Sequence, residues 1–276
     1  MQFKRLVWFF SWFLVYALFM KRRVQNWLAV CLILMGVQPS SASAGEVVVA
    51  VATNFLLPAR EISAAFEADT GHAVVLVAGA TGKLATQILA GAPFDIFLAA
   101  DQARPELLVS REVAVAESRF TYATGALALW SRNGLPLTGT TIETLDTIRI
   151  SRLAMANPKL APYGIAARQT LERIGALGKL SGRIVYGENI GQTFAMVASG
   201  NVTVGLIARS QLVNLPNDKQ GHWIGVPAIL HEPILQDGVL INRAINNNVA
   251  QAFLKFMRSD QVIKTIIRYG YGVSQP

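Results

Sequence analysis

Cysteine is almost absent from this sequence. The 276 residues include a single cysteine, Cys31, so no internal disulfide can form and no thiolate metal site is expected. Charged residues are also scarce, at 15%, whereas hydrophobic residues make up 52%. That balance excludes an intrinsically disordered chain, and the length predicts one large domain or two small ones.

Acidic residues are missing from the first 44 positions, which hold five of the 25 basic residues. The formal net charge of the whole chain is +8, so the part from Gly45 onward carries only about +3. Its charges are scattered along the chain. A nucleic-acid surface needs clustered basic residues, so we expect no nucleic-acid partner.

Residues 1–44 have the form of an export leader. From Met20 onward, the basic cluster Lys21–Arg23 is followed by the apolar stretch Trp27–Val37 and by Ala42-Ser43-Ala44 before Gly45. This order is typical of a secretory signal peptide, and Met20 is then a candidate for the true start. The alternative is an uncleaved anchor, but each apolar stretch is shorter than the ~20 residues of a membrane span. We therefore expect a soluble periplasmic protein.

Common catalytic motifs are missing as well. The segment Gly79–Leu84 (GATGKL) resembles part of a phosphate loop, but a Walker loop needs Gly where Val77 stands and Ser or Thr where Leu84 stands. The chain has no G-x-S-x-G elbow and no H-E-x-x-H motif.

A carboxylate pair is the remaining candidate for catalysis. Asp95 and Asp101 flank an expected strand and could serve an exported hydrolase together with a histidine, although strand-end capping is the favoured interpretation. The three histidines are dispersed: His72, His222 and His231. We predict a protein that is not an enzyme, uses no cofactor and binds no metal through its own side chains.

The segments that are present alternate between strand and helix patterns. Short β-branched runs predict strands, and apolar residues at helical spacing predict helices. The expected strands are 46–52, 72–78, 94–99, 126–131, 149–156, 183–186, 204–207 and 234–241, and the expected helices are 55–69, 83–90, 104–113, 165–174, 193–198, 246–257 and 262–269.

This alternation predicts an α/β protein with mixed, mostly parallel sheets flanked by helices. Because the pattern restarts near Thr124, we expect two lobes: residues 45–123 with 231–276, and residues 124–230. Without a flexible linker, the lobes would be joined by paired crossovers. Their ligand would then lie in the cleft between them.

Four turns before expected helices carry mostly small, amide, hydroxyl or glycine residues rather than a run of charge: Thr53-Asn54, Gly79–Gly82, Pro162–Gly164 and Glu188–Thr193. A helix N-terminus offers free N–H groups and a partial positive charge. Such turns gather at the carboxyl ends of strands, where α/β proteins bind ligands. Each turn alone is an ordinary cap, but together they predict a site for a compact anion.

The runs 49–71 (VAVATNFLLPAREISAAFEADTG), 79–102 (GATGKLATQILAGAPFDIFLAADQ) and 152–175 (RLAMANPKLAPYGIAARQTLERIG) carry a family resemblance. They resemble the periplasmic molybdate-binding proteins of bacterial molybdate ABC transporters, and the similarity covers nearly all of Gly45–Pro276. The resemblance implies a two-lobed solute-binding protein that hands molybdate, and often tungstate, to a membrane permease.

The resemblance also implies the contacts of the anion. They match Thr53 and Asn54 after the first strand, Thr81 before the second helix, Tyr163 at a helix start, and the backbone N–H of Ile190. Some family members add a tyrosine hydroxyl where Ala208 stands here. Either Tyr163 supplies that hydroxyl from another direction, or the site has one donor fewer.

We therefore expect an importer component that binds molybdate or tungstate, acts as a monomer and delivers its ligand to an inner-membrane permease. Three alternatives remain open at this point: a binding protein for sulfate, phosphate or another anion, an exported hydrolase, and a sensory module that docks a membrane receptor.

Overall fold

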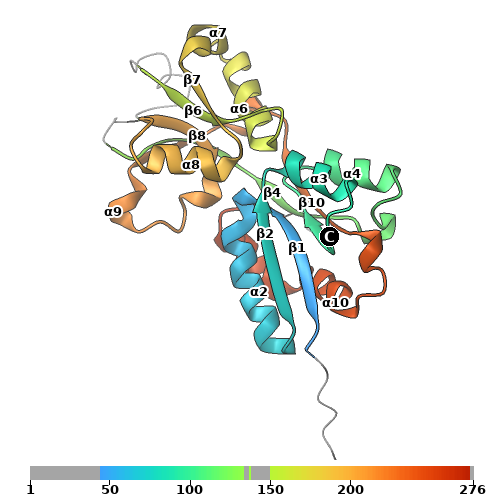
Figure 1. Ribbon diagram of the computed structural model, residues 1–276. Coiled ribbons are helices and arrows are strands. Elements are labelled where there is room, and N and C mark those ends of the chain that lie inside the picture. The colour runs from blue at the N-terminus through green and yellow to red at the C-terminus, as the bar shows by residue number, and fades with distance from the viewer. Residues whose placement is uncertain (1–43, 134–136, 138–149, 274–276) are drawn as a thin grey trace, which may run out of the picture. The chain divides into compact units, whose positions relative to one another are not determined.

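A computed structural model describes residues 44–133, 137 and 150–273. The predicted leader lies outside the described residues. Within them, the chain forms two five-stranded sheets, each flanked by helices (Figure 1). No helix among the described residues is long and apolar enough to cross a membrane.

The first sheet has the strand order β2-β1-β3-β10-β4. β1 runs parallel to β2 and β3, whereas β10 is antiparallel to β3 and β4. The strand bounds are β1 (Glu46–Ala52), β2 (Ala73–Gly79), β3 (Ile96–Leu98), β4 (Phe120–Gly125) and β10 (Ile234–Leu240).

The side chains of a strand point alternately to the two faces of its sheet. Alternate residues of β1 therefore pack into two separate hydrophobic cores. Val47, Val49 and Val51 pack under α2 (Leu56–Thr70), α10 (Asn248–Phe256) and α11 (Asp260–Arg268). Ala50 faces the other core, together with residues of α3 (Thr81–Leu89) and α4 (Ala103–Ser110). This sheet and these five helices are called the first-sheet half below.

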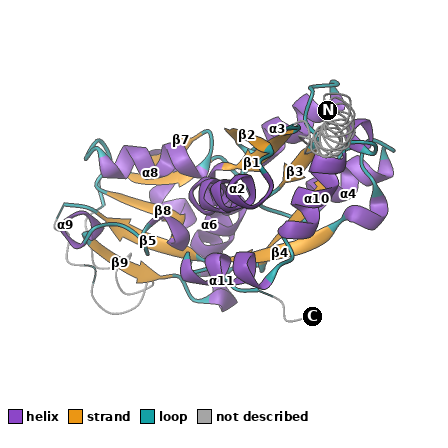
Figure 2. Ribbon diagram, turned by 90° about the horizontal axis from the view of Figure 1, so that it is seen from below, coloured by secondary structure: helices purple, strands orange, loops and turns teal. Residues whose placement is uncertain are grey.

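The second sheet has the order β7-β6-β8-β5-β9, with β6 parallel to β7 and β8, and β5 antiparallel to β8 and β9. The strand bounds are β5 (Leu127–Ser131), β6 (Leu153–Ala156), β7 (Ile184–Gly187), β8 (Val204–Ala208) and β9 (His222–Gly225). The helices of this part are α6 (Pro162–Arg173), α7 (Leu177–Leu180), α8 (Ile190–Ala198) and α9 (Asn217–Gln220). Together they form the second-sheet half (Figure 2).

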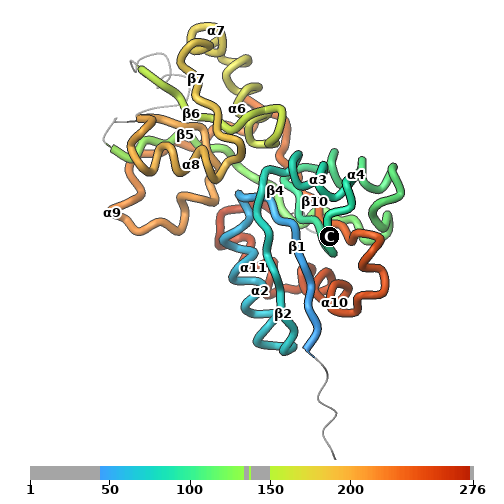
Figure 3. Tube along the Cα trace, viewed as in Figure 1, coloured from blue at the N-terminus to red at the C-terminus, as the bar shows by residue number. Residues whose placement is uncertain are grey.

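The chain passes between the halves twice, and the two passages lie side by side. It leaves the first sheet after β4 and returns to it at β10, and Ile234 pairs with Gly125 where these strands meet (Figure 3). The predicted mixed α/β class is confirmed. In each sheet two of the four strand pairs are parallel and two are antiparallel. The antiparallel pairs involve the strands next to the passages.

The structure differs from the sequence-based expectation at several element boundaries. β6 begins at Leu153, four residues after the expected start, and residues 134–136 and 138–149 lie outside the described part. β4 and β9 were not expected as strands. Three helices begin two or three residues earlier than expected, at Thr81, Pro162 and Ile190, which places their first residues in the polar turns.

Phe253 is fully buried and meets Phe66 edge-to-face, with ring centroids 5.2 Å apart. Phe253→Ala should lower the free energy of unfolding by about 3–5 kcal/mol, because it removes this packing and leaves a cavity. Leu57→Ala, on the exposed side of α2, is the matched control and should change stability by about 0.5 kcal/mol or less. Equal effects in urea titrations would contradict this description of the core.

Candidate ligand-binding site

All four polar turns named in the sequence border one small cavity of about 10 Å³. Every predicted contact lines it: Thr53, Asn54, Thr81, Tyr163 and Ile190. The remaining lining residues are Ala52, Gly79, Ala80, Ala100, Ala161, Pro162 and Asn189. The cavity therefore takes residues from both halves of the molecule, and none of its lining side chains is charged.

Three helices begin at this cavity with N–H groups that the protein leaves unpaired. The N–H groups of Thr81, Tyr163 and Ile190 stand in the first turns of α3, α6 and α8, where no intrahelical acceptor exists. Within residues 44–133, 137 and 150–273, no other acceptor is found for them. Their helix dipoles add partial positive charge at the same place, so the cavity is suited to an anion.

Two of the three helices that begin at the cavity lack a side-chain cap. Asn247 and Ser259 cap α10 and α11 with their side chains, which occupies the first N–H groups of those helices. α3 and α6 have no side-chain cap, since alanines precede them. At α8 the Asn189 side chain accepts from the N–H of Gln192, so the N–H groups of Thr81, Tyr163 and Ile190 all remain available for a ligand.

Two threonine hydroxyls add neutral donors. The Thr81 hydroxyl is buried and accepts a hydrogen bond from the N–H of Ala100 at 3.2 Å. The Thr53 hydroxyl accepts one from the N–H of Gly191 at 3.3 Å, across the two halves. Because each oxygen already accepts, its own hydrogen remains free to be donated.

Asn54 differs from the expectation that its side chain donates to the anion. Its amide nitrogen donates to Gln236 Oε1 at 2.8 Å and to the Tyr271 hydroxyl at 3.1 Å. An amide group has two hydrogens, so both are used within the protein. Asn54 can therefore offer the cavity only its main-chain N–H.

Tyr163 lines the cavity, but its hydroxyl reaches away toward the paired passages. It accepts a hydrogen bond from Gln236 Nε2 at 3.2 Å. Burial raises the pKa of Tyr163 well above its usual value, so the hydroxyl is neutral. Ala208 is buried at the end of β8 and does not line the cavity, so no hydroxyl replaces the family tyrosine there.

A buried polar network under the cavity is the part of the site that the sequence did not reveal. Gln236 and Tyr271 contact the Asn54 side chain directly, and Tyr122 is connected to it through Gln236. Both tyrosines contact Phe55, with ring centroids 4.6 and 5.5 Å away. Only the structure shows that their hydroxyls face Asn54 and Gln236.

Two charged residues lie in or next to the turns that border the cavity. Lys83 of the first-sheet half and Glu188 of the second form an ion pair of 2.7 Å, with both side chains about half exposed. Such a pair contributes about 1 kcal/mol or less. Among the described residues, no cluster of three or more His, Cys, Asp or Glu side chains is placed to hold a metal ion.

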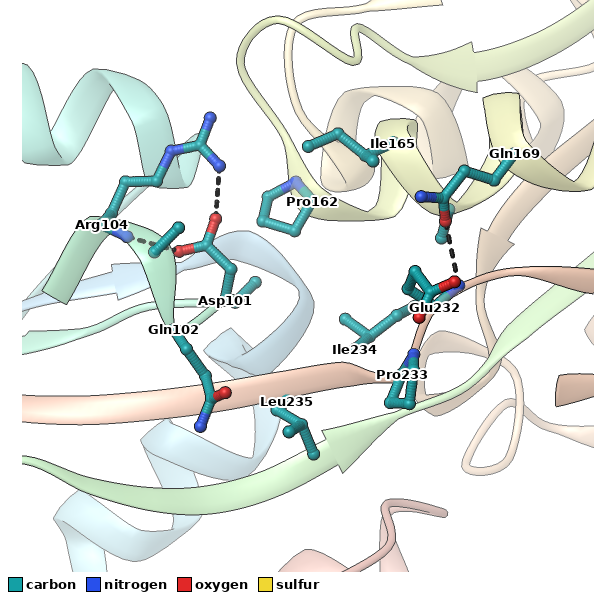
Figure 4. A pocket seen from close by; sticks show the side chains of 13 residues that line it. Asp101, Gln102, Arg104, Pro162, Ile165, Gln169, Glu232, Pro233, Ile234 and Leu235 are labelled. Atoms are coloured by element: carbon teal, nitrogen blue, oxygen red, sulfur yellow. Dashed lines mark hydrogen bonds and ion pairs between the residues drawn. The ribbon is translucent and has the colours of Figure 1, made fainter. Parts of the chain in front are cut away.

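A second, larger cavity of about 230 Å³ adjoins the first and shares Ala100 and Pro162 with it (Figure 4). Asp101 lies on its wall and is paired with Arg104. Burial raises the pKa of Asp101, an effect that Arg104 partly offsets.

The carboxylates proposed for a hydrolase are held separately. Asp95 accepts from the N–H of Val48 and pairs with Arg243, and Asp101 pairs with Arg104. No hydrogen bond from a histidine ring to either carboxylate is found in the described part of the chain.

A family model for bacterial extracellular solute-binding proteins matches residues 47–272. The chain belongs to this family. It is 40% identical to the molybdate-binding protein ModA of Rhodobacter capsulatus over 234 residues, covering 83% of this chain and 89% of that protein. It is also 40% identical to ModA of Azotobacter vinelandii over 238 residues, covering 86% and 94% of the two chains.

The solved structure of the Azotobacter vinelandii periplasmic molybdate-binding protein superposes with a TM-score of 0.79 and 35% identity, covering 83% of this chain and all of that one. These relatives are named as binding proteins. The fold predicted from the sequence resemblance is thereby confirmed.

Gly125 gives the site a direct test, since a Cβ there would lie 2.2 Å from the Tyr163 hydroxyl and 2.7 Å from Gln236 Nε2. Gly125→Ala should lower stability by about 1–3 kcal/mol through overpacking and displace both side chains. Gly178→Ala, where a Cβ meets nothing within 4 Å, is the control and should leave stability unchanged or raise it. Thermal unfolding of both variants measures the difference, and an unaltered Gly125→Ala protein would contradict this packing.

Proposed function

We propose that this protein is the substrate-binding component of an ABC importer and that it binds molybdate in the small cavity. One observation carries the proposal: turns from both halves meet at a cavity that has helix N-termini and hydroxyls but no charged side chain. Relatives 40% identical to the chain are named molybdate-binding proteins, which supports the choice of anion. The proposed contacts are Thr53, Asn54, Thr81, Tyr163 and Ile190.

Neutral donors suffice for a doubly charged anion when the site is buried. A hydrogen bond to a charged acceptor contributes about 1.5–3 kcal/mol net. Three free N–H groups and two hydroxyls therefore provide a large share of the affinity without a cation. A fully deprotonated oxyanion such as molybdate or tungstate suits a site made of donors.

Sulfate and phosphate are the competing ligands. Phosphate carries a proton at neutral pH and needs an acceptor, and none of the lining side chains is a carboxylate. Sulfate has the same charge and shape as molybdate but is smaller, so cavity size decides between them.

Ligand entry requires the cavity to widen. Its volume of about 10 Å³ is near the lower limit for one water molecule, and a tetrahedral oxyanion is larger. We propose that residues 45–123 with 231–276 move as one lobe against residues 124–230. The contacts between these two parts include the bonds from Gly82 N–H to Leu160 O at 2.9 Å and from Gly191 N–H to Thr53, and the ion pair of Lys83 with Glu188. We propose that these three open.

The cellular setting follows from the same assignment. An export leader at residues 1–44 would place the protein in the periplasm, where it would act as a monomer and deliver the anion to an inner-membrane permease.

Calorimetry of the purified protein with molybdate, tungstate, sulfate and phosphate tests the ligand. We expect heat of binding with molybdate and tungstate, and none with phosphate. Sulfate binding as tight as molybdate binding would contradict the proposed specificity.

The Thr81 hydroxyl can be tested separately. Thr81→Val should weaken molybdate binding by about 1–3 kcal/mol, because a donor to a charged group is lost. Thr86→Val, on the exposed side of the same helix, is the matched control and should bind as the native protein does. A dissociation constant unchanged by Thr81→Val would remove this hydroxyl from the site.

A further inference from the structure

Gln236 lies fully buried beneath the small cavity, on the strand that carries the chain back into the first sheet. The pairing of β10 with β4 shifts register between Gln236 and Asp237. Register shifts of this kind often stand next to functional sites, where they redirect a side chain. Gln236 does not line the cavity, and no sequence motif points to it.

The Gln236 amide connects the two halves of the site. Its oxygen accepts a hydrogen bond from Asn54 Nδ2 at 2.8 Å, in the first-sheet half. The Tyr122 hydroxyl donates its hydrogen to Ala99 O at 2.8 Å and lies 3.2 Å from the same Gln236 oxygen. Its nitrogen donates to the Tyr163 hydroxyl at 3.2 Å, in the second-sheet half. The planar amide of Gln236 thereby sets the distance between Asn54 in the first turn and Tyr163 at the start of α6.

The consequence for Asn54 is a fixed main chain. Besides the bond to Gln236, its amide donates to the Tyr271 hydroxyl, and its carbonyl oxygen accepts from that hydroxyl at 2.7 Å. The Ser210 hydroxyl of the second-sheet half also donates to this carbonyl, at 3.4 Å. These bonds hold the turn Thr53–Phe55, so its N–H groups keep one direction.

Gly125 leaves the space that this arrangement needs. It lies opposite Ile234 in the strand pair, and any side chain there would collide with both Tyr163 and Gln236. The amide of Gln236 and the hydroxyl of Tyr163 therefore meet at the junction of the two passages.

We propose that Gln236 is a positioning residue for oxyanion binding: it holds the Asn54 turn and the Tyr163 helix start at the spacing at which their N–H groups converge on the anion. This inference rests on the proposed function, since it assigns the residue that organises the same site. Gln236 itself does not touch the anion.

Gln236→Glu separates positioning from packing, because glutamate has nearly the same shape and replaces the amide NH₂ with an oxygen that can be protonated or ionised. Its protonated form keeps an acceptor and a donor, whereas the ionised form buries a negative charge beside the anion site. Burial raises the pKa of such a carboxyl strongly. The neutral form, present below that pKa, should bind molybdate well, and the ionised form, present above it, should bind poorly.

The native protein provides the baseline for this pH profile. The titratable groups that face Gln236 are Tyr122 and Tyr163, with Tyr271 next to them on Asn54, and burial raises the pKa of all three. None of these hydroxyls ionises between pH 6 and 9. The adjacent Asp237 pairs with Arg119 at 2.7 Å and accepts a hydrogen bond from the Thr121 hydroxyl.

The test measures the dissociation constant of molybdate by calorimetry at pH 6 and at pH 9. We expect the Gln236→Glu protein to bind about tenfold to a hundredfold more weakly than native at pH 9 and to approach native affinity at pH 6. The native constant should change little. Gln236→Leu should bind weakly at both pH values, because it leaves Asn54 and Tyr163 without their shared partner.

Gln102→Leu is the matched control. Gln102 is a partly buried glutamine that donates to Thr121 on β4 and to Asp237 on β10 but contacts none of the proposed anion ligands. The Gln102→Leu protein should bind molybdate with the dissociation constant of the native protein.

Native-like binding by Gln236→Leu at either pH would overturn the positioning role while leaving the proposed function intact. No binding of molybdate by the native protein would instead overturn the proposed function and this inference with it.

Discussion

Unpaired N–H groups at the starts of three helices set the chemistry of this protein. A helix cannot satisfy its own first N–H groups, and most proteins pair them with a capping side chain or with water. Here α3 and α6 begin after alanines, and the donors of Thr81, Tyr163 and Ile190 converge on one cavity without a charged neighbour. A buried anion is the guest that such a cavity would stabilise most.

The two-sheet architecture explains why these helix starts can meet. Each turn follows the carboxyl end of a strand, and the two sheets present those ends to each other where the chain passes between them. The paired passages on β4 and β10 then occupy the floor, where Gly125 and Gln236 lie. The floor is polar but fully hydrogen-bonded, which keeps the turns in place without placing a charge near the cavity.

Sequence patterns predicted most of this arrangement, because each turn could be recognised from uncharged residues between a strand and a helix. The β-branched run at Glu46–Ala52 forms β1 with the expected bounds. The role of Asn54 could not be predicted correctly, since its amide is taken by Gln236 and Tyr271, 182 and 217 residues away in the chain. Gln236 lies in a strand without a motif, so only its long-range contacts reveal it.

The central claim is that a dianion is held by uncharged donors alone. The most direct measurement is a crystal structure of the protein grown with molybdate, using the anomalous scattering of molybdenum to locate the ion. The account predicts one peak between the turns of Thr53, Thr81, Tyr163 and Ile190, with no lysine or arginine nitrogen within hydrogen-bonding distance. A peak in the larger cavity beside Arg104, or one contacted by Lys83, would contradict it.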